Sequence, residues 1–191
     1  MSELVFLLEE ESAAALLETF LPRILCDDVT VRTIVFEGKS DLAQNAARKI
    51  RAYQNPGARF LILTDQDRDP DCEKVKRRFL EECQKSGRAE RCVVRIACRE
   101  LETFYLADLN AVATALDCPD IEGKQDRRAY RNPDSLTGPS VLLAQLTEGH
   151  YRKVSGSREI GRYLDIENHR SASFRNFVGA IRRLQDELLA I

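Results

Sequence analysis

The sequence predicts an α/β fold in which a parallel sheet of about four strands is flanked by helices and followed by a helical, basic C-terminal region. Four short apolar runs alternate with segments of helical periodicity over the first 110 residues. This order is typical of a parallel sheet covered by helices on both faces. Acidic residues follow the first, third and fourth runs. Since functional groups of such sheets gather at the carboxyl ends of the strands, we expect a site there.

The expected strands are continuous apolar or β-branched runs, the kind that lies buried between helices. They cover residues 3–8, 29–36, 59–64 and 92–97. Apolar side chains recur at helical spacing over residues 9–25, 41–53 and 71–86, and again from residue 98. After residue 123 the pattern changes to turns and short helices, with a last helix near residues 174–189. We expect an α/β core over residues 1–120 and a helical extension over residues 121–191 that packs on it.

Composition and motifs exclude several classes of protein. No apolar run is long enough to span a membrane, and the N-terminus lacks the features of a signal peptide, so we expect a cytoplasmic protein without a membrane partner. Six cysteines without a CxxC pair and only two histidines argue against a zinc site. The GKS at residues 38–40 lacks the first glycine of a P-loop, and the aspartates at 65–69 lack the glycine of a calcium loop.

Charge is distributed unevenly along the chain, although the formal net charge is only −2. Residues 1–38 contain eight acidic and two basic residues, whereas residues 123–163 contain eight basic and four acidic residues. An acidic site beside a basic surface suits a phosphate-bearing substrate. The alternative is that these charges are segregated by chance on solvated faces.

Carboxylates follow the expected strands at the edge where a site should form. Glu9 follows the first strand, Asp65 and Asp67 follow the third, and Glu100 and Glu102 follow the fourth. Oxygen ligands without sulfur or imidazole favour Mg²⁺ or Mn²⁺ over zinc. The sequence therefore predicts a magnesium or manganese site built from these side chains.

Two questions about the carboxylates stay open at this point. Glu10 directly follows Glu9, and because successive strand side chains point in different directions, only one of the two should face the metal. We favour Glu9. Asp69 is a further candidate ligand, but Asp69 or Asp71 could instead cap the next helix. Capping needs a single aspartate, so it does not account for all four.

The motifs FLLEEES (residues 6–12) and LILTDQD (residues 61–67) resemble the two sequence elements of the Toprim domain, a strand ending in glutamate and a later strand ending in DxD. Glu10 stands where that family usually has glycine. The wider sequence, with ACRELETFYLADL at residues 97–109 and YRKVSGSREI at residues 151–160, is similar to a small stand-alone Toprim family of unknown function.

This resemblance implies metal-dependent hydrolysis of phosphodiester bonds in DNA or RNA, as in the nucleases of the overcoming-lysogenization-defect type. Those nucleases are fused to an ATPase, and since this chain has no P-loop, a separate ATPase subunit is the implied partner. The same analogy implies a role in defence against phage. In this scheme Glu9, Asp65 and Asp67 are metal ligands, Glu100 or Glu102 completes a second metal site, and Lys153 offsets charge in the transition state.

Six basic residues are candidates for holding the phosphates of a nucleic acid: Lys39, Arg99, Lys124, Arg128, Lys153 and Arg158. For each of them a solvated surface position is the alternative. Two other functions compete with nuclease activity. A primase-like nucleotidyl transferase would share the metal site. A non-catalytic module would bind a protein partner, and its acidic residues would serve structure.

Overall fold

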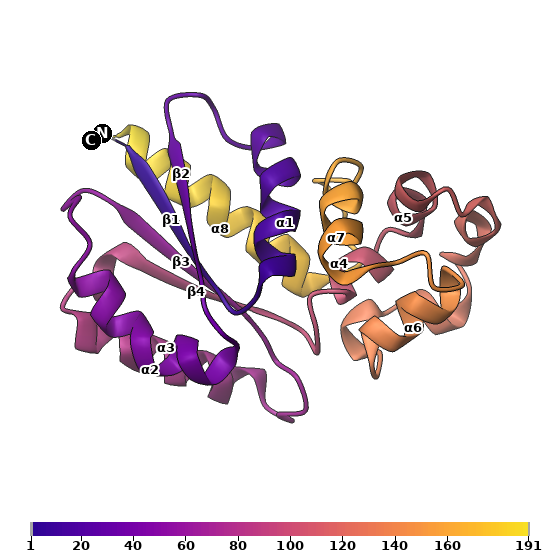
Figure 1. Ribbon diagram of the computed structural model, residues 1–191, viewed down its shortest axis with the longest axis horizontal. Helices are drawn as coiled ribbons and strands as arrows, with labels where there is room; N and C mark the ends of the chain where they lie inside the picture. The colour runs from indigo at the N-terminus through magenta and orange to yellow at the C-terminus, as the bar shows by residue number, and fades with distance from the viewer. Residues whose placement is uncertain (1, 191) are drawn as a thin grey trace.

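The computed structural model describes residues 2–190 as one parallel four-stranded sheet flanked by helices, and it confirms the predicted α/β class (Figure 1). The strands are β1 (Glu3–Leu8), β2 (Thr30–Val35), β3 (Arg59–Asp65) and β4 (Cys92–Ala97). They lie in the order β2-β1-β3-β4, and every neighbouring pair is parallel. The apolar runs were therefore sufficient to locate all four strands.

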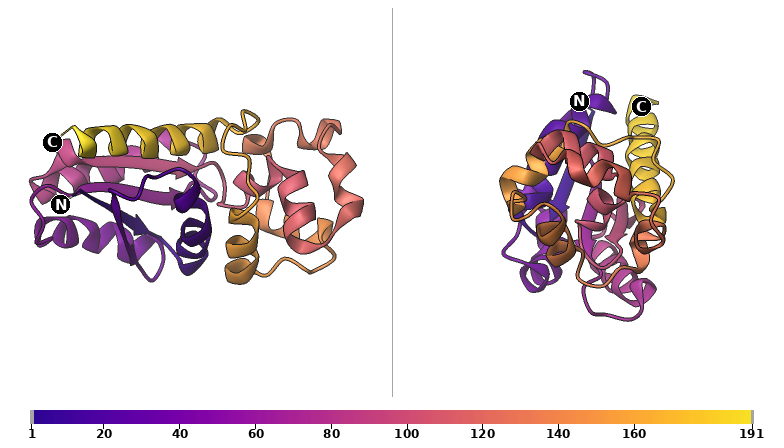
Figure 2. Two further views of the ribbon diagram at one scale, coloured as in Figure 1. Left: turned by 90° about the horizontal axis from the view of Figure 1, so that it is seen from above. Right: turned by 90° about the vertical axis from the view of Figure 1, so that its right-hand side faces the viewer.

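Helices cover both faces of the sheet, which is why β1 is buried along its whole length. On one face Leu4, Phe6 and Leu8 pack into a core shared with α1 (Glu11–Phe20) and α8 (Ala172–Leu189). On the other face Val5 and Leu7 pack into a core shared with α2 (Lys39–Arg51) and α3 (Cys72–Ser86). Figure 2 shows α8 running along the sheet, so the last helix of the chain belongs to this layered unit.

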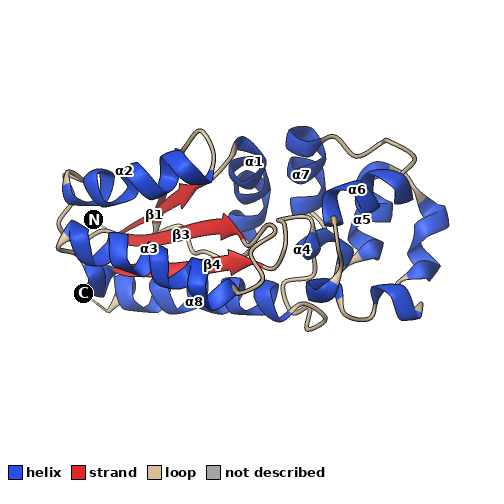
Figure 3. Cartoon of the chain, turned by 90° about the horizontal axis from the view of Figure 1, so that it is seen from below, coloured by secondary structure: helices blue, strands red, loops and turns tan. Residues whose placement is uncertain are grey.

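A second, helical region lies beyond the carboxyl ends of the strands, toward which the arrowheads in Figure 3 point. It contains α4 (Thr103–Leu106), α5 (Leu109–Leu116), α6 (Pro139–Leu146) and α7 (Lys153–Gly161). Short 3₁₀ turns complete the chain: η1 (Leu21–Arg23), η2 (Ala89–Arg91), η3 (Pro119–Lys124), η4 (Arg128–Tyr130) and η5 (Pro133–Ser135). The helical region contacts the layered unit mainly where α7 packs against α1.

The boundary expected at residue 120 stays a prediction. Two helices before that residue, α4 and α5, lie in the helical region, whereas α8 after it packs against β4 and β1. Helix α3 begins one residue later than expected because Asp71 occupies its capping position. Within residues 2–190 no helix combines the length and apolarity needed to cross a membrane.

Strand order creates a switch point between β1 and β3. The chain leaves β1 toward β2 on one side, then crosses back over β1 to reach β3 on the other side. The two connections that follow β1 and β3 therefore diverge and leave a crevice at the carboxyl ends of these strands. In open α/β sheets this crevice is the usual ligand site.

Candidate active site

Glu9 and Asp65 lie at the carboxyl ends of β1 and β3, where the switch point falls. Leu8 pairs with Leu63 in the sheet, which places Glu9 opposite Thr64. The Thr64 hydroxyl donates a hydrogen bond to Oε2 of Glu9, and the backbone N–H of Asp65 donates to the same oxygen at 3.2 Å. Glu9 is therefore fixed against β3, and the expectation that Glu9 and not Glu10 faces a metal stays a prediction.

Asp65 is the centre of the carboxylate cluster. Burial raises the pKa of its carboxyl well above the ordinary value, and the charges of Glu9, Glu102, Glu10 and Asp67 raise it further. Within residues 2–190 this carboxylate has neither an ion pair nor a hydrogen-bond donor. A carboxylate surrounded by carboxylates and lacking a cation will either hold a proton or attract a cation from outside.

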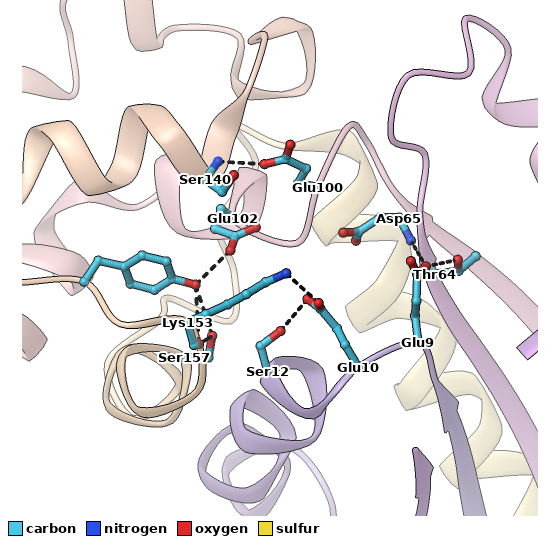
Figure 4. A network of polar contacts seen from close by, with 11 residues as sticks. Glu9, Glu10, Ser12, Thr64, Asp65, Glu100, Glu102, Ser140, Lys153 and Ser157 are labelled. Atoms are coloured by element: carbon cyan, nitrogen blue, oxygen red, sulfur yellow. Dashed lines mark hydrogen bonds and ion pairs between the residues drawn. The ribbon is translucent and has the colours of Figure 1, made fainter. Parts of the chain in front are cut away.

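Lys153 pairs with this cluster through Glu10. From the first turn of α7 its Nζ reaches Oε2 of Glu10, while the Ser12 hydroxyl donates to the other oxygen of Glu10 (Figure 4). Burial alone lowers the pKa of Lys153, but the pairing with Glu10 and the charges of Glu102 and Asp65 raise it above the ordinary value. Lys153 therefore keeps its positive charge at neutral pH.

Glu102 is the most deeply buried carboxylate of the site, with 1% of its surface exposed. Burial raises its pKa, and a hydrogen bond of 2.9 Å from the Tyr151 hydroxyl opposes that rise. The Tyr151 side chain is itself buried, and its hydroxyl oxygen lies 3.3 Å from Ser157 Oγ. This chain of contacts ties the start of α4 to α7 and so fixes the helix that carries Lys153. Sequence periodicity does not predict the hydrogen bond between Tyr151 and Glu102, because these residues are 49 positions apart in the chain.

Asp67 lies on the other side of the β3 terminus and has a different environment. Its side chain is half exposed and pairs with Lys39 at the start of α2. Asp67 and Arg99 both have left-handed backbones, with φ of 57° and 63°, and the N–H of Asp67 donates to Arg99 O at 2.6 Å. Non-glycine residues hold such conformations at a cost of about 1–3 kcal/mol where the surrounding structure imposes them, often beside ligand sites.

Two further acidic candidates serve local structure. Asp71 caps α3 by accepting hydrogen bonds from Glu73 N at 2.9 Å and Lys74 N at 3.3 Å, so the capping alternative is confirmed for this aspartate. Asp69 accepts a hydrogen bond from Asp71 N at 3.1 Å and supports the same cap. One carboxylate after the fourth strand, Glu100, accepts from Ser140 N at 2.7 Å in the first turn of α6 (Figure 4).

The six basic candidates do not gather in one place. Lys153 and Lys39 contact the carboxylates directly, and the Arg99 backbone is fastened to the loop that carries Asp67. Arg158 pairs with Glu18 of α1 at 2.9 Å. The remaining two, Lys124 and Arg128, lie on η3 and η4, and η3 packs against α5.

The site contains oxygen donors of the kind that Mg²⁺ and Mn²⁺ prefer, but in the described residues the side chains are not arranged as a ligand set. Among the described residues no group of three or more His, Cys, Asp or Glu is placed to hold a metal ion. The unpartnered Asp65 carboxylate, with Glu9 and Glu10 beside it, supplies the hard oxygen donors that these ions prefer. Ligation by Glu9 would replace its bond from Thr64, and ligation by Asp67 would replace its pairing with Lys39.

The fold and site thus define an α/β protein with a carboxylate cluster at the switch point of a parallel sheet. A family model described as "Domain of unknown function (DUF4276)" matches residues 8–182, and the chain belongs to this family. No curated protein and no solved structure matches the chain. Since the family description states no activity, the resemblance to the Toprim domain remains a prediction.

Proposed function

We propose that this protein is a Mg²⁺- or Mn²⁺-dependent nuclease of Toprim type that hydrolyses phosphodiester bonds in DNA or RNA. The observation that carries the proposal is the unpartnered Asp65 carboxylate in the β1/β3 crevice, with Glu9, Glu10 and Glu102 as its charged neighbours. Such a cluster is costly without a counter-ion, and a divalent cation offsets that cost. By the Toprim resemblance alone, we further propose a separate ATPase subunit as a partner and a role in phage defence.

In this proposal Glu9, Asp65 and Asp67 hold the metal, with Glu10 as the neighbouring acid. When bound, the ion supplies activation of water and stabilisation of negative charge on the phosphate. Lys153 stays cationic and faces the same cluster, so it can donate to a phosphate oxygen as charge develops there. Glu102 and Tyr151 act behind it as positioning residues, because their buried hydrogen bond holds α7 in place.

The first experiment measures metal binding and cleavage in the same preparations. Calorimetry with Mg²⁺ and Mn²⁺ is combined with incubation of single- and double-stranded DNA and RNA. Asp65→Asn is expected to lose metal binding and to lower cleavage at least about a hundredfold, because it removes one ligand charge. The matched control is Glu73→Gln, an exposed acidic residue in the first turn of α3.

Equal metal binding and equal cleavage by Asp65→Asn and Glu73→Gln would contradict the proposal. Primer extension with nucleoside triphosphates, in place of hydrolysis, would favour the primase-like alternative. Absence of both metal binding and catalysis in the parent protein would favour the partner-binding module. Thermal unfolding of each variant is measured alongside, so that loss of activity through unfolding is recognised.

A further inference from the structure

A cavity of about 450 Å³ lies beside the carboxylate cluster, on the side of Asp67 that faces α2 and α3. Four cations and two carboxylates line it: Lys39, Arg68, Lys74, Arg78, Asp67 and Asp69. Its position next to Asp67 places it at the same edge of the sheet as the candidate active site. The carboxylate cluster has an excess of negative charge, whereas this cavity has an excess of positive charge.

Three of these cations have no anionic partner. Lys39 pairs with Asp67, but Arg68, Lys74 and Arg78 make neither an ion pair nor a side-chain hydrogen bond in the part of the chain that the structure describes. Arg77, next to Arg78 on α3, pairs with Asp71 and does not line the cavity. Cations gathered without partners around one cavity attract an anion and raise its local concentration.

The fold brings these cations together from separate segments. Lys74 and Arg78 are four residues apart on α3 and therefore share one face of that helix. Lys39 begins α2, which packs beside α3, and Arg68 comes from the loop after β3 (Figure 1). The loop is held in place by Gln66, whose side-chain amide donates to Asp69 O at 2.7 Å. The cations therefore line a cavity with a defined wall.

We propose that this cavity binds a phosphate group of the substrate, next to the phosphodiester that is cleaved at the carboxylate cluster. Naming a nucleic-acid strand as the source of this phosphate rests on the proposed function. Arg68 and Arg78 carry planar guanidinium groups, which can each donate two hydrogen bonds to a phosphate. Lys39 contacts Asp67 now, and a phosphate bound by Lys39 would release Asp67 toward the metal site. Phosphate binding and metal binding therefore support each other.

The test measures binding of a fluorescent 12-nucleotide single strand by anisotropy at several salt concentrations, with Ca²⁺ in place of Mg²⁺ to suppress cleavage. Arg68→Ala, Lys74→Ala and Arg78→Ala are each expected to reduce the slope of log affinity against log salt by about 0.7. At 0.1 M salt this slope change corresponds to about fivefold weaker binding. The matched control is Arg77→Ala, which removes the same charge from the same helix outside the cavity. A parallel titration uses a fluorescent nucleoside triphosphate.

Weaker binding of the strand by the three cavity variants, with Arg77→Ala unchanged, supports a polynucleotide phosphate site. The same pattern with the triphosphate alone supports the site and identifies a free nucleotide as the source of the phosphate. If the three variants bind both probes like Arg77→Ala, the phosphate site is overturned, even where the parent protein cleaves nucleic acid in Mg²⁺. If the variants differ but the parent cleaves nothing, the phosphate site stands and the nuclease proposal falls.

Discussion

The two sides of the β3 terminus carry opposite imbalances of charge. The inner side, which faces the helical region, is a cluster of four carboxylates and one cation: Glu9, Glu10, Asp65, Glu102 and Lys153. The outer side, which faces α2 and α3, is the phosphate cavity with four cations and two carboxylates. The inner side has an excess of negative charge and the outer side has an excess of positive charge. A metal ion would balance the first and a phosphate group the second.

The comparison shows that two aspartates of one DxD motif can have different environments. Asp65 is partly buried among like charges and has no partner, whereas Asp67, two residues later, is half exposed and paired with Lys39. The left-handed backbone at Asp67 turns the chain between them. The motif in the sequence therefore locates both carboxylates at the edge of the sheet, but each aspartate obtains its chemistry from the elements packed around it.

The largest effect is expected from removing the single cation of the inner side. Lys153→Met should lower cleavage about a hundredfold, because charge on the phosphate is no longer offset in the transition state. The same variant should bind Mg²⁺ more tightly, because one repelling charge is gone. Calorimetry and cleavage rates measure the two effects, with Arg152→Met as the control, an exposed residue next to Lys153. If Lys153→Met weakened both metal binding and cleavage, Lys153 would act only through folding.

The second-largest effect is expected from a change in the spacing between α1 and α7, which positions the residues of the inner side. A Cβ added at Gly161 would lie 2.5 Å from Thr19 Oγ1 and 2.8 Å from Leu16 O, and the second contact is with backbone. Gly161→Ala should therefore lower the free energy of unfolding by about 1–3 kcal/mol. It should also move Lys153 away from Glu10 and reduce cleavage, because Glu10 directly precedes α1 and Lys153 begins α7.

Strand binding by the outer side should keep its salt dependence in Gly161→Ala, since no residue of the phosphate cavity lies on α1 or α7. The control is Gly179→Ala on α8, where an added Cβ meets no atom within 4 Å. Urea unfolding measures the stability of both variants. A parallel loss of cleavage and of salt-dependent binding in Gly161→Ala would show that the two sides are not independent.

Sequence patterns were sufficient to locate the sheet and to name each residue of the inner side as a candidate, but not to show how these residues are held. A continuous apolar run identifies β1 whichever strands it pairs with. Glu9 and Asp65 could be placed because Glu9 directly follows β1 and Asp65 is the last residue of β3. The bond between Glu102 and Tyr151 joins distant segments, so no local pattern reports it.

Of the cations of the outer side, only Lys39 was a candidate from the sequence, and the other three could not be recognised for a related reason. Lys74 and Arg78 have the spacing of an ordinary solvated helix face. Nothing near them in the sequence indicates that Lys39 of α2 lies on the same cavity. Such a surface can be identified only when the packing of the two helices is known. That packing depends on the apolar faces of the helices and not on their charges.

The smallest of the three effects is the change of the free energy of unfolding with pH that the unpartnered Asp65 carboxyl causes. The folded protein raises the pKa of this carboxyl well above the unfolded value of about 4, because burial and neighbouring carboxylates disfavour its charge. Between these two pKa values the folded state holds a proton that the unfolded chain has released. Its stability contribution is therefore fully present below pH 4 and is lost as pH rises through the folded pKa.

Asp65→Asn cannot ionise, so in EDTA it should become more stable than the parent protein as pH rises above about 4, with no difference at lower pH. Part of Asp65 remains accessible to water, which screens the neighbouring charges and limits the size of the effect. Urea unfolding at pH 4, 5.5, 7 and 8.5 measures the difference. Saturating Mg²⁺ should close it by stabilising only the parent protein, since binding to the folded state adds to stability. A difference that does not change with pH, or one that Mg²⁺ leaves open, would mean that Asp65 has a counter-charge within the fold and that the inner side needs no metal.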